Sequence, residues 1–139
     1  MNVNRLTQKL DFQAQALTLR AERQRVIASN IANADTPGYQ ARDMDFSTAL
    51  KAATGHLPVA GQMATTQAGH MALPGNASPT ATALRYATPS QTNLDSNSVD
   101  MDRERASFAE NSVKYEATLR FINSHVREML DAMKSPTQG

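Results

Sequence analysis

The chain has 139 residues, enough for one domain at most, and its formal net charge is +1. So balanced a charge gives no strong field to attract nucleic acid or an anionic lipid surface. Cysteine is absent, which excludes disulfides, thiolate catalysis and cysteine-ligated zinc. There is no Trp and aromatic residues make up 5%, so seven Met, which are adaptable packing side chains, must supply part of the apolar contact area.

A long amphipathic helix is predicted over about residues 4–33. Its apolar residues recur mostly at steps of three, four or seven, which is helical spacing. The first stripe consists of Val3, Leu6, Leu10, Ala14, Leu17, Ala21, Ala28 and Ile31. A second stripe, Phe12, Leu19 and Val26, lies beside it. Because a surface helix needs one apolar face, the second stripe indicates a second packing partner.

A turn motif follows the first helix. Pro37 fixes φ at the second position of a β-turn, and Gly38 supplies the positive φ that the third position of a type II turn requires. Asn33 is expected to end the helix. The residues that define the motif are Ala32, Asn33, Thr36, Pro37, Gly38 and Tyr39. Alone, the Pro-Gly pair predicts no more than a helix end and a turn.

Residues 55–92 differ in composition from both ends of the chain. They are mostly Ala, Thr, Gly, Pro, Ser and Gln, and they hold four of the six prolines. Such a segment buries too little apolar surface to offset the entropy of ordering it. We expect a flexible or extended connector, with room for short β pieces, that becomes ordered only against a partner.

The strongest pattern lies at the C-terminal end, over about residues 98–134. Apolar residues alternate there at steps of four and three, an a/d heptad pattern with one polar interruption at Ser112. The set is Phe108, Ser112, Tyr115, Leu119, Ile122, Val126, Met129 and Met133. Asn97 or Ser98 is expected to cap this helix, and acidic residues in its first turns favour the positive end of the helix dipole.

These elements predict a mainly α fold. The two terminal helices would pack as an antiparallel, coiled-coil-like pair joined by the turn motif and a long irregular connector. The expected divisions are residues 1–34 for the N-terminal axial helix, 35–54 for the turn motif and following segment, 55–92 for the connector and 93–139 for the heptad helix. Because an isolated two-helix hairpin is marginal in water and leaves apolar stripes uncovered, the sequence predicts assembly with neighbours.

The string Ser-Asn-Ile-Ala-Asn-Ala-Asp-Thr-Pro-Gly-Tyr at residues 29–39 resembles the N-terminal signature of flagellar axial proteins of the rod and hook class. Residues 41–46 follow the turn as in rod members of that family. Residues 97–104, with Asn111 and Tyr115, resemble the C-terminal signature of the same family. The resemblance covers about residues 1–49 and 93–133, and the chain is too short for the large outer domain of hook proteins.

The resemblance implies a structural, non-enzymatic component of the proximal rod of the bacterial flagellar basal body, without cofactor. It also implies export by the flagellar type III apparatus without a cleaved signal peptide, and assembly in the periplasm. The expected neighbours are the adaptor FliE, other proximal rod proteins and copies of the chain itself. No nucleic acid partner is expected, because the net charge is close to zero. No membrane insertion is expected either, since no apolar stretch reaches membrane-spanning length.

On this interpretation, torque passes through side chains packed between long helices. The residues assigned to that packing are Leu10, Leu17, Phe108, Tyr115, Leu119, Ile122, Val126 and Met129. Charged residues at positions 20–25 could pair with Glu110 or Glu116 of another subunit. A solvated charged face is at least an equal explanation, because single surface ion pairs contribute little.

Other kinds of site have weaker support. Residues 100–111 superficially resemble a calcium loop, but they carry Arg105 where Gly is needed and Asn111 where Glu is needed. Asp43 and Asp45 could form an acid–base pair, but nothing in the sequence builds a pocket around them. His56, His70 and His125 lack metal-ligand spacing.

Two other classes of protein remain as alternatives. A generic coiled-coil adaptor or secretion chaperone would explain the heptads but not the turn motif, and it would not itself be exported. A membrane-surface protein using the first helix would need an apolar anchor, but that helix has no Trp and carries acidic residues.

Overall fold

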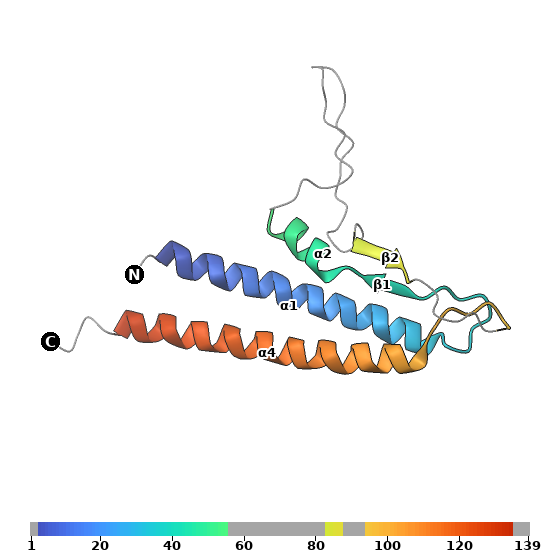
Figure 1. The fold of residues 1–139 in the computed structure, drawn as a ribbon. Coiled ribbons are helices and arrows are strands. Elements are labelled where there is room, and N and C mark those ends of the chain that lie inside the picture. The colour runs from blue at the N-terminus through green and yellow to red at the C-terminus, as the bar shows by residue number, and fades with distance from the viewer. Residues whose placement is uncertain (1–2, 56–82, 88–93, 135–139) are drawn as a thin grey trace, which may run out of the picture.

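The computed structural model describes residues 3–55, 83–87 and 94–134 (Figure 1). The elements in chain order are α1 (Val3–Ala32), β1 (Arg42–Met44), α2 (Phe46–Ala53), β2 (Leu84–Tyr86) and α4 (Met101–Lys134). The two long helices lie side by side and run in opposite directions, so both termini are at the same end of the molecule. The predicted mainly α fold with an antiparallel helix pair is confirmed.

The expected connector falls largely at residues 56–82 and 88–93, which lie outside the described residues. Part of it is described. β2 pairs antiparallel with β1, with Arg42 opposite Tyr86 and Met44 opposite Leu84. The short β pieces anticipated for the connector are therefore present at residues 84–86.

α1 has two packing faces. One face lies against α4, and the other lies under β1 and α2 (Figure 1). On the second face Leu19, 3% exposed, joins Met44, Ala49 and Ala83 in a small apolar core. The stripe that contains Leu19 was predicted to need a second partner, and for Leu19 that partner is supplied by the same chain. Phe12, from the same stripe, remains 44% exposed.

Helix α2 is fixed by its N-cap. The Asp45 carboxylate accepts hydrogen bonds from the backbone N of Thr48 at 3.1 Å and from its Oγ1 at 2.8 Å. These two bonds to Thr48 lower the pKa of Asp45, because they favour the charged form. Asp45 N also donates to the carbonyl of Ala83, which ties the start of α2 to the strand that returns from the connector.

Helix α4 begins at Met101, three residues beyond the expected range start. Asp100 caps it, because its Oδ1 accepts from the backbone N of Asp102 at 3.1 Å and of Arg103 at 3.2 Å. The prediction that Asn97 or Ser98 would cap this helix is therefore wrong. Both side chains are buried and bond instead to the segment after α1.

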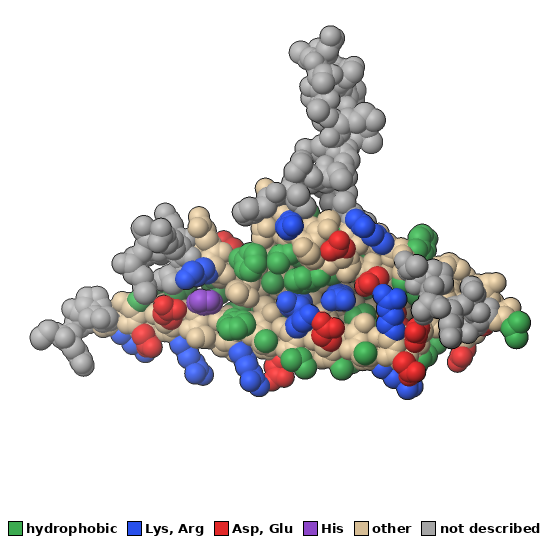
Figure 2. Space-filling model, in the orientation of Figure 1, with side chains coloured by type: hydrophobic (Ala, Val, Ile, Leu, Met, Phe, Trp, Pro, Cys, Tyr) green, Lys and Arg blue, Asp and Glu red, His purple; other side chains and the backbone are tan. Residues whose placement is uncertain are grey.

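The surface in Figure 2 shows hydrophobic side chains gathered around α2 and a mixture of acidic and basic side chains along α4. No helix in the described part of the chain is long and apolar enough to cross a membrane. Within the same residues, no group of three or more His, Asp and Glu is placed to hold a metal ion.

Candidate functional site

The two signature segments, far apart in the sequence, meet at the end of the helix pair. Asn97 makes the central link and is fully buried. Its Nδ2 donates to the backbone carbonyls of Asn33 at 2.9 Å, Ala34 at 2.9 Å and Thr36 at 2.8 Å. An amide nitrogen carries two hydrogens, so one of them is shared between two of these acceptors. The Oδ1 of Asn97 accepts from Val99 N at 2.8 Å, so both polar atoms of the side chain are used.

The turn that Asn97 holds has the predicted geometry. Tyr39 N donates to the carbonyl of Thr36 at 3.2 Å, which closes a four-residue turn. Gly38 occupies the third position with φ of +72°. Gly38 N donates in turn to the carbonyl of Asp95 at 2.8 Å, so the tip of the turn is bonded to the chain just before the C-terminal signature segment. The helix before it ends where Asn33 bonds back to the Ser29 carbonyl with its backbone N and its side chain.

Asn30 lies beneath the turn and is 1% exposed. Its side-chain amide pairs with the backbone of Arg42 as a strand neighbour would. Nδ2 donates to the Arg42 carbonyl at 2.7 Å, and Oδ1 accepts from Arg42 N at 3.0 Å. Tyr39 Oη also donates to the Oδ1 of Asn30 at 3.2 Å. One buried amide thus fastens α1 to the chain entering β1.

A backbone connection completes the junction. Ser98 N donates to the Tyr39 carbonyl at 3.0 Å, and Ala41 N donates to Ser98 Oγ at 2.8 Å. The segment entering α4 therefore lies along the segment leaving the turn. Here we define the closed end as residues 29–42 together with 95–104.

Glu104 ends this region on α4 and is 8% exposed. Burial is the main cause that raises the pKa of its carboxyl, and the charges of Asp43 and Asp100 raise it further. A hydrogen bond from the Asn30 side chain and the charge of Arg103 act in the opposite direction. The cost of burying the charged carboxylate, at the start of the interface between the helices, is therefore only partly offset by these two contacts.

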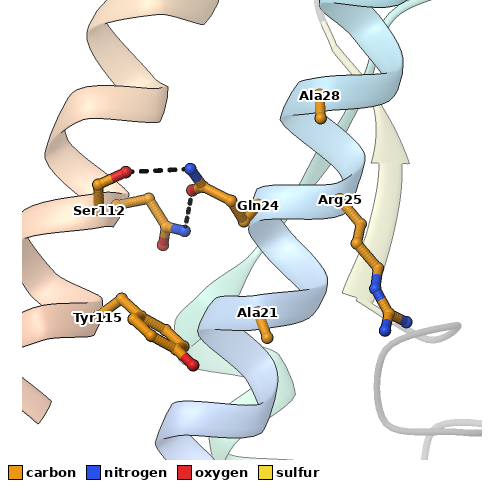
Figure 3. A pocket seen from close by; sticks show the side chains of 7 residues that line it. Ala21, Gln24, Arg25, Ala28, Ser112 and Tyr115 are labelled. Carbon is orange, nitrogen blue, oxygen red and sulfur yellow. Dashed lines mark hydrogen bonds between the residues drawn. The ribbon is translucent and has the colours of Figure 1, made fainter. Parts of the chain in front are cut away.

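The α1–α4 interface continues with polar contacts. Asn111, 1% exposed, donates from Nδ2 to the Arg20 carbonyl at 2.9 Å and to Gln24 Oε1 at 2.6 Å. Gln24 Nε2 donates to Ser112 Oγ at 3.0 Å (Figure 3). Arg20 Nε donates to Thr118 Oγ1 at 3.2 Å, while the Arg20 guanidinium lies 4.3 Å from the centre of the ring of an α2 residue, Phe46.

The residues predicted to form the helix packing are placed unevenly. Leu10, Leu17, Tyr115, Ile122 and Met129 are half-buried. Phe108, Leu119 and Val126 remain 41%, 37% and 39% exposed. Within one chain the heptad helix therefore directs only part of its apolar stripe at α1. We call Leu119, Val126 and Met133, which follow Ser112 at seven-residue intervals, the outer stripe.

Sequence reasoning missed the residues that occupy the interface instead. Glu104, Asn111, Thr118 and His125 also recur every seven residues, and the first three are buried. This polar repeat is present in the sequence as a second heptad series. Asn111, Thr118 and His125 each directly precede a member of the predicted heptad pattern, namely Ser112, Leu119 and Val126. A search for apolar periodicity does not find it, because that pattern assigns the buried face to apolar residues.

Four of the charged residues considered for contacts between subunits are paired within their own helices: Glu22, Arg25, Glu110 and Glu116. Arg25 lies 3.0 Å from Glu22, and Arg120 lies 2.6 Å from Glu116. Glu110 pairs with Lys114, one turn further along α4. Pairing of these groups with another subunit stays a prediction.

A groove of about 360 Å³ opens between the two helices. Ala21 and Ala28 of α1 leave space there because their side chains are short, and Tyr115 of α4 stands across from them (Figure 3). Gln24 and Ser112 lie between, already bonded to each other. The groove is a helix-packing feature, since the serine hydroxyl in it is engaged with an amide and donates to a backbone carbonyl.

Comparison with known proteins agrees with this arrangement. Residues 10–40, which hold most of α1 and the turn, match the family described as "Flagella basal body rod protein". The flagellar basal body rod protein FlgB of Salmonella typhimurium is 45% identical over 134 residues, covering 95% of this chain and 97% of its own length. The FlgB proteins of Escherichia coli and Proteus mirabilis are 43% and 45% identical over 96% and 95% of this chain.

The matched region thus includes both segments of the closed end and both long helices. The chain belongs to the flagellar basal body rod protein FlgB family.

Proposed function

We propose that this chain is a subunit of the proximal part of the flagellar rod and transmits torque through the packing of its long helices. Membership of the family gives it a structural role in the basal body rod, among other rod and basal body components. The proximal position, the mode of torque transmission and the particular neighbours are part of the proposal.

The observation that carries the proposal is the contrast between a closed end and an uncovered helix face. Leu119 and Val126 are 37% and 39% exposed, and Met133 at the next interval is 67% exposed. Apolar side chains repeated along one helix gain free energy when a neighbour removes them from water. A rod subunit that meets neighbours along its length would present such a face, because many small contacts resist shear.

The partners and the route follow from the same proposal. The neighbours of this face would be copies of the chain, other proximal rod proteins and the adaptor FliE. The chain would reach the periplasm through the flagellar type III export apparatus, without a cleaved signal peptide, and would act without catalysis. Agreement with rod proteins over about 95% of the chain supports this reading against a generic adaptor or secretion chaperone.

A deletion of the gene in its own flagellated host tests the proposal. We expect a non-motile strain with no completed rod or hook in electron micrographs of basal bodies, and recovery of both when the gene is restored. A deletion strain that swims with intact basal bodies would overturn the proposal. A chain found only in the cytoplasm of a swimming strain would instead favour the chaperone alternative.

A further inference from the structure

A line of short side chains runs along α1 beside its contact with α4. Ala14, Ala21 and Ala28 follow one another at seven-residue intervals, and we call them the alanine stripe. Ala14 and Ala28 are exposed and Ala21 is half-buried. Ala21 and Ala28 also line the groove of about 360 Å³ between the two helices, with Tyr115 standing across from them (Figure 3). The alanine stripe therefore leaves room for side chains that this chain does not supply.

The same groove contains a polar atom that the described chain leaves unsatisfied. Asn111 lines the groove and is 1% exposed. Its Nδ2 donates to the Arg20 carbonyl and to Gln24 Oε1, but its Oδ1 is buried and has no hydrogen-bond partner among the described residues. Buried acceptors in folded proteins are nearly always bonded to a donor. This observation is independent of the alanine stripe and indicates that a single chain leaves the groove incomplete.

Larger side chains with the same period stand on α4. The outer stripe, Leu119, Val126 and Met133, also advances by seven residues, about 10 Å of helix. Its members are 37%, 39% and 67% exposed, so the chain that carries them does not cover them. Helices pack closely when the side chains of one enter the spaces between side chains of the other. The outer stripe of one copy therefore matches the alanine stripe of another in both size and spacing.

The charges beside the two stripes are complementary as well. Glu22 precedes Arg25 on α1, and Glu116 precedes Arg120 on α4. The side chains of Arg25, Glu116 and Arg120 are 78%, 63% and 78% exposed. When α4 of a second copy lies antiparallel to this α1, Arg25 faces Glu116 and Glu22 faces Arg120. A parallel arrangement would set Glu22 against Glu116 and Arg25 against Arg120, and such like-charge contacts are unfavourable.

Size and charge indicate the same alignment of the two helices. With Leu119 of the second copy placed over Ala21, Val126 lies over Ala14, because both steps are seven residues. In the same antiparallel alignment Arg25 lies within one residue of Glu116. Since the two patterns use different residues, their agreement favours α4 of this chain as the occupant over an unrelated helix.

We propose that the alanine stripe is the docking site for α4 of a second copy of this chain, which lies antiparallel to α1 with its outer stripe against the alanines. Because α1 and α4 of one chain run in opposite directions, two copies in the same orientation meet in this way (Figure 1). The contact joins two different surfaces, so it does not close on a dimer and can continue from copy to copy. The inference rests on the proposed function for the place of assembly and adds which surfaces meet.

Disulfide crosslinking in basal bodies tests the contact. The chain has no cysteine, so Thr18→Cys and Asn123→Cys can be introduced alone or together in the flagellated host. Both residues are exposed, and they lie seven residues from Arg25 and Glu116 in the directions that make them face each other. After oxidation, the chain with both cysteines should shift from monomer to dimers and higher multimers on immunoblots of basal bodies run without reductant.

The controls use neighbouring positions on the same helices. Each single-cysteine variant should stay monomeric, because Thr18 faces Asn123 and not a second Thr18. Thr18→Cys with Ser124→Cys is the matched pair, since Ser124 is exposed and adjacent to Asn123 but about 100° further around α4. This pair should stay monomeric too.

The outcomes separate this inference from the rod assignment. If the chain with Thr18→Cys and Asn123→Cys is present in basal bodies but stays monomeric, the proposal is overturned and the rod assignment stands, with another protein or none over the alanine stripe. Equal multimers in the test pair and the Ser124→Cys pair would also overturn it, because no defined alignment would exist. A parent chain absent from basal bodies would overturn the proposed function as well.

Reversing the charges gives a second test that needs no cysteine. Arg25→Glu and Glu116→Arg should each shrink the swimming zone in soft agar, because each places like charges together at every contact. The two changes in one chain restore opposite charges and should return the zone towards that of the parent. Single variants that swim like the parent, or a double variant no better than the singles, would overturn the proposed alignment.

Discussion

The closed end and the outer stripe differ in how completely the chain itself covers or satisfies their side chains. At the closed end, Asn30 and Asn97 are almost wholly buried, yet each uses both polar atoms of its amide in hydrogen bonds to backbone groups. On the outer stripe, Leu119 and Val126 are apolar and lie partly in water. The first region satisfies its polar groups within the chain, whereas the second leaves apolar surface in water, where the proposed function places a neighbour.

This difference separates folding from assembly. Buried amides that satisfy backbone groups fix a local shape, because an orphaned carbonyl there would cost free energy. Exposed apolar side chains leave free energy to be gained later, when another surface covers them. Substitutions at the closed end should therefore act on the isolated chain, whereas substitutions on the outer stripe should act on the assembled structure.

Asn97→Ala should give the largest effect and would break the comparison if it did not. The variant leaves the carbonyls of Asn33, Ala34 and Thr36 and the backbone N of Val99 without their partner. At about 1–3 kcal/mol for a buried group left unsatisfied, we expect the free energy of unfolding to fall by at least ~3 kcal/mol, with motility lost as a result.

Urea denaturation of the purified chain, followed by circular dichroism, measures this loss. Asn123→Ala is the control, since it removes an exposed amide from α4. A loss for Asn97→Ala no larger than that of the control would mean that the closed end does not determine folding.

Leu119→Asp should separate the two regions most sharply. Leu119 is 37% exposed and otherwise covered by its own chain, so the variant should lower the free energy of unfolding of the isolated chain by only about 1–2 kcal/mol. In the host, however, a carboxylate on the outer stripe would be buried against a neighbour without a partner, so incorporation into basal bodies and swimming should be lost.

Val113→Asp is the matched control, because Val113 is 68% exposed on the same helix and lies outside the heptad series. Immunoblots of isolated basal bodies measure incorporation for both variants. Full incorporation of Leu119→Asp would show that the outer stripe is not part of the surface that contacts neighbouring subunits.

Much of this fold was predictable because it depends on local pattern. The period of apolar residues gave both long helices, and Pro37 with Gly38 gave the turn, since each acts through its own backbone preference. The cap of α4 was not found, because Asp100, Asn97 and Ser98 are all good capping residues and the choice depends on what else needs them. Asn97 is occupied by the carbonyls after α1, a contact that no local rule contains.

The polar interface was missed for a related reason. Hydrophobicity alone cannot tell a stripe that meets its own chain from one kept for a neighbour. Tyr115 and Leu119 belong to one sequence pattern, but the first is half-buried against α1 and the second is 37% exposed. The rotation of α4 about its own axis decides which of its residues face α1. That rotation is seen from the positions of Asn111 and Gln24 in the structure, not from the sequence pattern.

Gly38→Val should have a smaller effect that is confined to the closed end. A Cβ atom at Gly38 would meet no atom within 4 Å, so the main cost comes from the backbone, whose φ is +72°. A β-branched residue resists that conformation, and we expect a loss of about 1–2 kcal/mol in the free energy of unfolding. Gly38→Asn should lose less, because Asn tolerates positive φ. Equal stability of the two variants in urea denaturation would show that the positive φ at Gly38 does not cause the loss.

Glu104→Gln should give the smallest effect, and its sign tests how the closed end meets the interface. Burial raises the pKa of Glu104 above the ordinary value of 4.5, so between that value and the folded-state pKa the folded chain binds more protons than the unfolded chain. This carboxyl therefore makes stability fall as pH rises through that window, with its full penalty present above it.

The neutral amide has no such penalty and keeps a polar group beside Asn30. Relative to the parent, Glu104→Gln should be at least as stable at pH 7, and its advantage should shrink as the pH is lowered towards 4.5. Urea denaturation at a series of pH values measures the difference between the two chains. An advantage that grows on acidification would mean that the ionised carboxylate stabilises the junction, and that the closed end extends its satisfied polar contacts into the helix interface.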